Sequence, residues 1–185
     1  MVPRVNALHV VQRLAENNAW SNLRLHRACA RLAPADLHAE RSSFFKTVAR
    51  TLNHILVVDW YYVDALEDGG RGYGIFDDEE PFDAMEPLAR AQREVDARLV
   101  AYTRRLTSEA ALDAPVRLQR RDHVQVERAG DVLLHLSAHQ VHHRGQVHAM
   151  LSGTPVEPPQ LDEFFLSEEL PLRDEELRTL GLPLR

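Results

Sequence analysis

Four long segments of the sequence have helical character, with apolar residues spaced to line one face of an amphipathic helix. In the first segment, Leu8, Val11 and Leu14 begin an apolar stripe that continues at spacings of three, four and seven for most of its length. Four helices of about 20 residues or more predict an all-α four-helix bundle. The predicted helices cover about residues 6–32, 43–67, 84–106 and 131–151.

Residues that typically begin or end helices flank these segments. Ser42 or Ser43 could cap the second helix, and the glycine pair that begins at Gly69 stops it. Gly153 closes the fourth helix. Pro87 is tolerated only because it falls within the first turn of the third helix. The boundaries of the bundle helices are therefore predicted from local chemistry as well as from the apolar pattern.

Two connections between the helices have distinct patterns. Residues 71–81 are rich in glycine and acidic side chains, which predicts an exposed loop. Residues 115–119 and 123–127 alternate apolar and polar side chains, with two arginines and an aspartate between them. This alternation predicts a small exposed β-hairpin before the last long helix.

The C-terminal tail, residues 154–185, contains Phe164 and Phe165 and a short helical pattern at residues 174–180. It is too apolar to be purely disordered, so we expect it to pack on the bundle or on a partner. A chain of 185 residues has the usual size of one domain. Residues 1–185 are therefore predicted to form a single domain.

Composition narrows the classes of protein that fit the sequence. A net charge of −6 argues against nucleic acid or an anionic membrane as a partner. No apolar run reaches the roughly 20 residues that span a bilayer, and no signal peptide is evident. The single cysteine, Cys29, excludes an internal disulfide and lies within a helical pattern, where buried packing is expected. These features predict a cytoplasmic protein.

Histidines are concentrated in the fourth predicted helix, where five of the ten lie between residues 135 and 148. At about 100° per residue, His139 and His143 lie about 40° and 80° around the helix from His135. The core stripe of this helix is centred between about 60° and 120°. His143 is thus predicted to face the core and His139 its rim, whereas His142 and His148 point elsewhere and His135 is borderline.

His139 and His143 are four residues apart, which makes them neighbours on one face of the helix. This spacing allows two imidazoles to share one metal ion. The alternative is two core histidines whose hydrogen bonds are satisfied within the protein. Gln140 stands where the metalloprotease motif has its general-base glutamate, so the sequence gives no support to that type of proteolysis.

A third ligand would have to come from another helix, and His54 is the only histidine of the second one. It borders the inward stripe of that helix. On spacing alone, His54 could instead be a half-buried histidine paired with Asp59 or with a backbone carbonyl. Asp59 and Asp64 are rival oxygen ligands. The histidines expected on the surface or in loops are His9, His26, His38 and His123.

The segment LHLSAHQVHHRGQVHAM, residues 134–150, resembles the signature of the DinB-like (DinB/YfiT-type) metal-binding proteins. Residues 52–62 and 18–25 resemble the second and first helices of that family. The resemblance implies an up-down-down-up four-helix bundle that holds one divalent metal ion. Carried over by position, it implies His54, His139 and His143 as the metal ligands.

The sequence departs from the family pattern at two positions beside these histidines. Ala138 stands where the family usually has asparagine, and His142 stands where it usually has an aromatic residue. Neither departure removes a ligand, although both change what can hydrogen-bond around the site. Gly145 is expected to permit a close approach between helices.

Three histidine ligands would leave coordination positions open, which is typical of catalytic rather than structural metal sites. The resemblance favours a metal-dependent enzyme acting on a low-molecular-weight thiol, as a transferase or isomerase. A metal-dependent hydrolase, a non-catalytic stress-related metal-binding protein and a bundle without metal are the alternatives. Zinc or nickel is the expected metal, a small molecule the expected partner, and a homodimer fits the apolar tail. The sequence identifies no catalytic residue; Asp59, Glu16 and Tyr62 are candidates for a general base.

Overall fold

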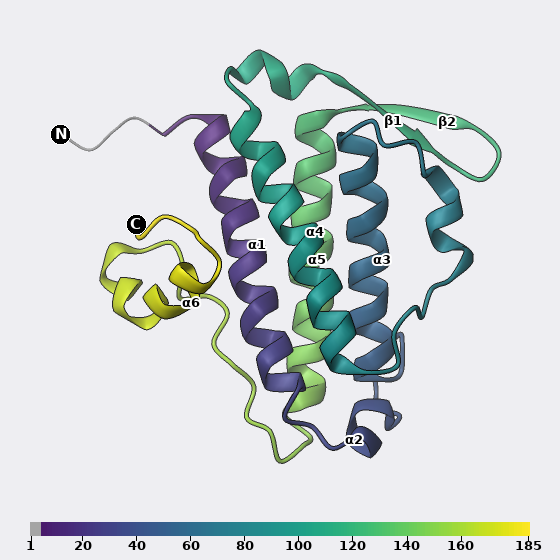
Figure 1. Ribbon diagram of the computed structural model, residues 1–185, viewed down its shortest axis with the longest axis vertical. Helices are drawn as coiled ribbons and strands as arrows, with labels where there is room; N and C mark the ends of the chain where they lie inside the picture. The colour runs from purple at the N-terminus through teal and green to yellow at the C-terminus, as the bar shows by residue number, and fades with distance from the viewer. Residues whose placement is uncertain (1–4) are drawn as a thin grey trace.

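The computed structural model describes residues 5–185 and confirms the predicted all-α bundle (Figure 1). Helix α1 packs against α4 and α5, and α3 packs against the same two helices, so that α1 and α3 are diagonal. Helices α1 and α5 run in one direction and α3 and α4 in the other, which is the up-down-down-up arrangement. The four bundle helices are α1 (Ala7–Cys29), α3 (Val48–Leu66), α4 (Met85–Arg105) and α5 (Ala129–Leu151).

Helix α3 begins at Val48, five residues later than predicted, and neither Ser42 nor Ser43 caps it. Thr47 is the cap, because its side chain accepts a hydrogen bond of 3.1 Å from the backbone N–H of Arg50. The residue before the cap, Lys46, has a φ of 69°, a left-handed conformation that interrupts a right-handed helix. This backbone geometry explains the late start, and a polar pattern alone does not predict it.

The connections contain short helices that the apolar pattern did not predict. The first bundle helix ends at Cys29 rather than near residue 32, and α2 (Pro34–His38) follows it with proline in its first turn. The segment predicted as an exposed loop contains the 3-10 helix η1 (Gly72–Asp77). Ile75 of η1 is buried against the bundle core, so this connection covers part of α3.

The predicted hairpin is present as β1 (Pro115–Gln119) and β2 (Val124–Arg128), which pair antiparallel. The second strand lies one residue beyond its predicted position. The hairpin is only partly exposed: no residue of β2 is buried, but Val116 and Leu118 of β1 are, because β1 packs on α3. Helix α5 then starts directly after β2, two residues earlier than predicted. Gly130 allows this close turn, since a Cβ there would lie 3.3 Å from the carbonyl oxygen of Leu112.

The core between the helices consists of two groups of apolar side chains. One group surrounds Trp20 and Tyr61 in the half of the bundle near the hairpin, and the other surrounds Leu25 and Leu52. Cys29 belongs to the second group and is fully buried, as predicted. Burial raises the pKa of its thiol to about 12, so Cys29 is a packing residue and not a reactive thiol.

The C-terminal tail packs along α1 and contains the 3-10 helix η3 (Ser167–Leu172) and the short helix α6 (Asp174–Thr179) (Figure 1). Phe164 is fully buried, and its ring lies 5.4 Å from that of Trp20 on α1. Arg13 covers the Phe164 ring, with its guanidinium carbon 4.6 Å from the ring centroid, and donates a 3.1 Å hydrogen bond to the Phe164 carbonyl. An aromatic anchor and cationic contacts therefore hold the tail.

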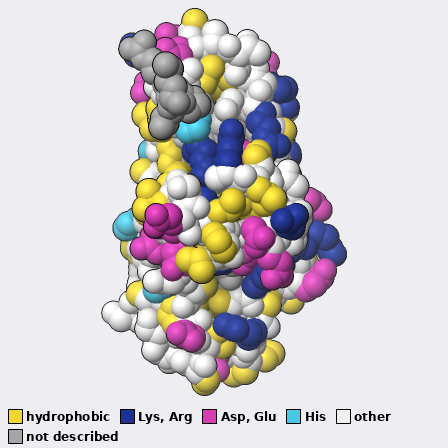
Figure 2. All heavy atoms as spheres, turned by 90° about the vertical axis from the view of Figure 1, so that its left-hand side faces the viewer, with side chains coloured by type: hydrophobic (Ala, Val, Ile, Leu, Met, Phe, Trp, Pro, Cys, Tyr) yellow, Lys and Arg dark blue, Asp and Glu magenta, His cyan; other side chains and the backbone are white. Residues whose placement is uncertain are grey.

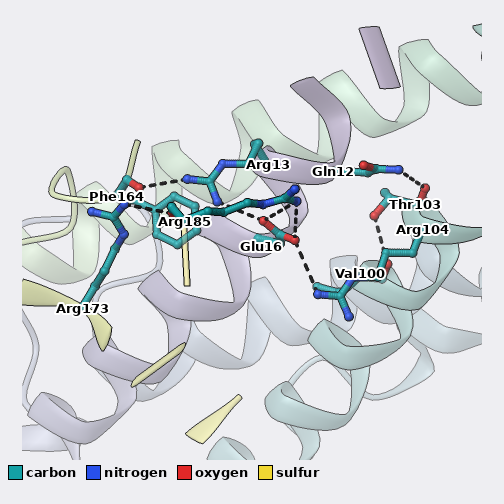
Figure 3. Close-up of polar contacts among 9 residues, drawn as sticks. All are labelled: Gln12, Arg13, Glu16, Val100, Thr103, Arg104, Phe164, Arg173 and Arg185. Carbon is teal, nitrogen blue, oxygen red and sulfur yellow. Dashed lines mark hydrogen bonds and ion pairs between the residues drawn. The ribbon is translucent and has the colours of Figure 1, made fainter. Parts of the chain in front are cut away.

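A buried carboxylate links this tail to the bundle (Figure 3). Glu16 of α1 is 2% exposed and pairs with Arg13 at 3.0 Å, with Arg185 of the tail at 3.1 Å and with Arg104 of α4 at 3.4 Å. Basic side chains gather on this side of the molecule (Figure 2). Because three guanidinium groups surround one carboxylate, Glu16 connects α1, α4 and the tail.

Replacing Phe164 with alanine is expected to lower the free energy of unfolding by about 3 kcal/mol, because a fully buried phenyl ring is lost from the contact with α1. Chemical denaturation followed by circular dichroism measures the change. Phe165→Ala is the matched control, since the Phe165 side chain is half exposed. An equal loss in the two variants would contradict the anchoring of the tail by Phe164.

No helix among residues 5–185 is both long enough and apolar enough to cross a membrane.

Candidate metal centre

Three histidines from two helices come together on one side of the bundle. His54 lies on α3, and His139 and His143 lie one turn apart on α5. Each offers a ring nitrogen, and these three nitrogens all lie within 4.8 Å of one another. The Nε2 atoms of His54 and His139 are 3.0 Å apart. The structure therefore brings together all three residues that the sequence analysis singled out as ligands.

Neighbouring side chains fix the orientation of these rings. Gln146 lies one turn beyond His143 on α5, and its Oε1 accepts a 2.9 Å hydrogen bond from His143 Nδ1. This bond leaves the other nitrogen of His143, Nε2, with a free lone pair. Phe45 stacks on His54 with ring centroids 4.1 Å apart and also approaches His143 at 5.6 Å. On the exposed side, Gln146 Nε2 forms a 3.2 Å hydrogen bond with His142 Nε2.

All three imidazoles are uncharged at neutral pH. Burial, followed by the neighbouring His143, lowers the pKa of His54 to about 4. Burial and the surrounding histidines lower the pKa of His139 to about 3, and burial also lowers the pKa of His143. Protonating any of them would place positive charges side by side in a partly desolvated site. Neutral imidazole is the form that binds metal ions.

The sequence of this chain matches one known protein family over most of its length. The model of the DinB family matches residues 4–175, which is nearly the whole chain. The chain belongs to the DinB family. This confirms the family that the segment around the histidine pair resembles.

Among solved structures, the chain is similar to a DinB-like protein from Bacillus cereus ATCC 10987, with a TM-score of 0.59 and 17% sequence identity. The similarity covers 76% of this chain and 90% of that one. At this identity the match shows a shared DinB-like fold. A search of curated proteins found no match.

The three histidines fit a divalent metal ion on geometric and chemical grounds. His139 is half-buried, and its Nδ1 has no hydrogen-bond partner among residues 5–185. His54 Nε2 and His139 Nε2 lie 3.0 Å apart, and in the tautomers that carry the proton on Nδ1 both nitrogens present lone pairs that a shared cation can bind. The donor set of three imidazoles suits zinc, nickel, copper and iron alike.

Asp59 and Asp64, the alternative oxygen ligands, make hydrogen bonds elsewhere in the protein. Asp64 accepts a 2.8 Å hydrogen bond from the backbone N–H of Arg71 and so shapes the loop after α3. Asp59 is fully buried and is bonded to Gln92 and Gln140. Neither carboxylate belongs to the histidine group.

Glu16 and Tyr62, the other candidates for a general base, make contacts away from the histidine group. Glu16 is paired with three arginines at the tail. The ring of Tyr62 packs against the exposed His135, with centroids 5.2 Å apart. The geometry therefore points to no general base among Asp59, Glu16 and Tyr62.

Two predictions about individual residues near the bundle core were wrong. His26, expected on the surface, is 4% exposed and lies inside the bundle on α1. Gly145, expected at a close contact between helices, is exposed, and a Cβ added there would meet no atom within 4 Å. Polar side chains can be buried when other polar groups surround them, which explains the error at His26.

Arg144, the residue before Gly145, forms buried hydrogen bonds between helices that the sequence did not predict. Its guanidinium is buried in the middle of the bundle and donates to the side-chain oxygens of Asn18, Asn22 and Gln140. These amides in turn donate to Asp96 and Asp59.

This buried network joins all four bundle helices. It lies directly behind the histidine centre, because Gln140 and Arg144 follow His139 and His143 in the sequence of α5. Burial raises the pKa of Asp59 to about 8 and that of Asp96 to about 6. It lowers the pKa of Arg144 to about 10. The network therefore holds one cation against two carboxyl groups whose charged forms are both disfavoured by burial.

A cavity of about 440 Å³ opens beside the histidine centre, and His54 forms part of its wall. Phe44 and Phe45 provide an aromatic side, and Lys46, the only lysine of the chain, provides a cation without an ion pair among residues 5–185. Arg50 also lines this cavity and pairs with Glu80 at 2.7 Å. The cavity therefore gives a small molecule access to the histidine centre at His54.

Proposed function

We propose that this protein is a metal-dependent enzyme that acts on a low-molecular-weight thiol, as an S-transferase or isomerase. The observation that carries the proposal is the group of three histidine nitrogens within 4.8 Å of one another, with the cavity of about 440 Å³ beside it. Membership of the DinB family supports a role in binding metal. His54, His139 and His143 would hold the ion, and zinc or nickel is the proposed metal.

A divalent ion held by three neutral imidazoles would keep coordination positions open and favour the ionised form of a bound thiol or water molecule at neutral pH. The residues of the chain supply the remaining parts of the site. Gln146 holds the ring of His143, and Phe45 covers His54 and limits access by water. Phe44 and Lys46 offer apolar and cationic contacts to a small organic molecule in the cavity.

In an S-transfer, the sulfur–carbon bond forms as the bond from that carbon to the leaving group breaks. The leaving group takes the electron pair, and the proton of the thiol passes to solvent. With 1-chloro-2,4-dinitrobenzene as the acceptor, chloride leaves and the thioether absorbs light. This reaction therefore provides a direct assay of thiol activation.

The test compares zinc- and nickel-loaded protein, purified without a histidine tag, on a panel of cysteine, glutathione and coenzyme A. We expect turnover above the uncatalysed rate with at least one thiol, and its loss in the His54→Ala/His139→Ala double variant. His135→Ala is the matched control, because His135 lies on the same helix but outside the histidine group. Turnover that persists in the double variant, or no turnover with any thiol, would contradict the proposal.

We also propose that the protein acts in the cytoplasm and forms a homodimer. The exposed Phe165 and Leu166 of the tail support an apolar interface between two copies. Light scattering of the full chain tests the dimer, and a monomeric mass would contradict it.

A further inference from the structure

Helices α1 and α4 form the side of the bundle opposite α3 and α5, which carry the three histidines (Figure 1). A second cavity is lined by residues of α1 and α4. Its volume is about 310 Å³, at the lower end of the range for sites that bind small molecules. No residue of the histidine centre lines it. A ligand of this cavity would therefore share no contact residue with the proposed metal.

The lining of this cavity combines apolar walls with a polar floor. Leu23, Met85 and Ala89 provide apolar surface. The floor contains His26, Gln92 and the carboxyl group of Asp96, which are 4%, 1% and 3% exposed. An apolar enclosure with a few buried polar groups is the usual composition of a small-molecule site.

Two of the buried floor residues keep polar atoms that no group of the protein satisfies. Neither Nδ1 nor Nε2 of His26 has a hydrogen-bond partner among residues 5–185, and the same is true of Oε1 of Gln92. Burial lowers the pKa of His26 to about 3, with Arg93 and Arg144 adding to the effect, so the ring is neutral and presents one donor and one acceptor. Each of these atoms is enclosed by the surrounding protein, so a ligand in the open space of the cavity would contact the apolar walls and the rim rather than these atoms.

The rim of the cavity carries more free positive charge than negative charge. Arg27 and Arg93 are exposed and form no ion pair with any residue from 5 to 185. The one carboxylate on the rim, Glu86, pairs with Arg90 at 3.1 Å. Two free guanidinium groups beside an apolar cavity favour a carboxylate, which they can bind through two parallel hydrogen bonds.

We propose that the cavity between α1 and α4 binds a small organic acid with an apolar body. The carboxylate lies at Arg27 and Arg93, and the apolar body fills the space between Leu23, Met85 and Ala89. Such a ligand covers the apolar walls and pairs with the free cations together.

The experiment uses 4-hydroxyphenylacetate as the probe and isothermal titration calorimetry on the full chain. We expect saturable binding with a 1:1 stoichiometry. Tyrosol, which has the same ring and hydroxyl group but an alcohol in place of the carboxylate, is expected to bind at least about tenfold more weakly, as for loss of one charge-assisted contact. Arg27→Ala/Arg93→Ala is expected to weaken the acid similarly, and Ala89→Leu is expected to abolish its binding by filling the cavity.

Matched controls separate this cavity from general charge effects and from the histidine centre. Arg117→Ala/Arg121→Ala removes the same charge from the exposed hairpin, and His143→Ala disrupts the metal centre; both are expected to leave the affinity unchanged. The proposal is overturned if the wild-type protein does not bind the acid, or if tyrosol binds equally well. Unchanged binding in Arg27→Ala/Arg93→Ala or in Ala89→Leu, or loss of binding in His143→Ala, would overturn it too.

Discussion

Replacing Arg144 with alanine is expected to lower the free energy of unfolding by about 3–5 kcal/mol, the usual cost of breaking a buried charged network. The guanidinium is 4% exposed and bonds to Asn18, Asn22 and Gln140. Without it, three amide oxygens lose their donor, and Asp59 and Asp96 lose the nearby positive charge that favours their ionised forms. Urea denaturation at neutral pH measures the change.

Two controls make this result specific to the network. Arg98→Ala removes an arginine that pairs with Glu67 near the surface, and we expect a loss of only about 0–1 kcal/mol. Asp96→Asn removes a charge that Arg144 balances, so the double variant is expected to lose less stability than the sum of the single variants. A loss in Arg144→Ala no larger than in Arg98→Ala would contradict the role of Arg144 in holding the four helices together.

Adding zinc or nickel is expected to raise the thermal stability of the metal-free protein, because an ion that binds only the folded state stabilises it. At a free-ion concentration of one hundred times Kd, the gain is about 2.7 kcal/mol, or on the order of 5–10 °C for a chain of this size. Differential scanning calorimetry of protein without a histidine tag measures the shift.

The same titration of His139→Ala is expected to show almost no shift, because the histidine group loses the nitrogen that lies 3.0 Å from His54 Nε2. His135→Ala is the matched control and is expected to behave like the wild-type protein, since its side chain is exposed and outside the group. An equal rise in His139→Ala would show that the ion binds elsewhere.

The sequence predicts the bundle well because its long helices have clear apolar stripes and helix-ending residues. The ends of the helices are less predictable where the backbone departs from standard geometry. The left-handed conformation of Lys46 delays α3 by five residues, and the polar residues before it look like ordinary helix caps. Helix α5 begins at Ala129, directly after strand β2, without a separating turn. The alternating apolar pattern of the strand therefore runs straight into the helical pattern, and no sequence signal marks the boundary.

The histidine pair on α5 is predictable from helical spacing, but its partner on α3 is not. Angular position distinguishes His139 and His143 from the other histidines of their helix, whereas His54 depends on family resemblance because no local pattern relates two separate helices. The buried polar residues were missed for the same reason. His26 and Arg144 look like surface residues in the sequence, and only the packing of four helices shows that amides and carboxylates surround Arg144.

The most direct test of the metal centre is an anomalous difference map from crystals of the untagged protein grown with zinc or nickel, recorded at the absorption edge of the metal. We expect one strong peak bonded to ring nitrogens of His54, His139 and His143. The absence of a peak between these three side chains, or a single peak at another place in the molecule, would contradict it.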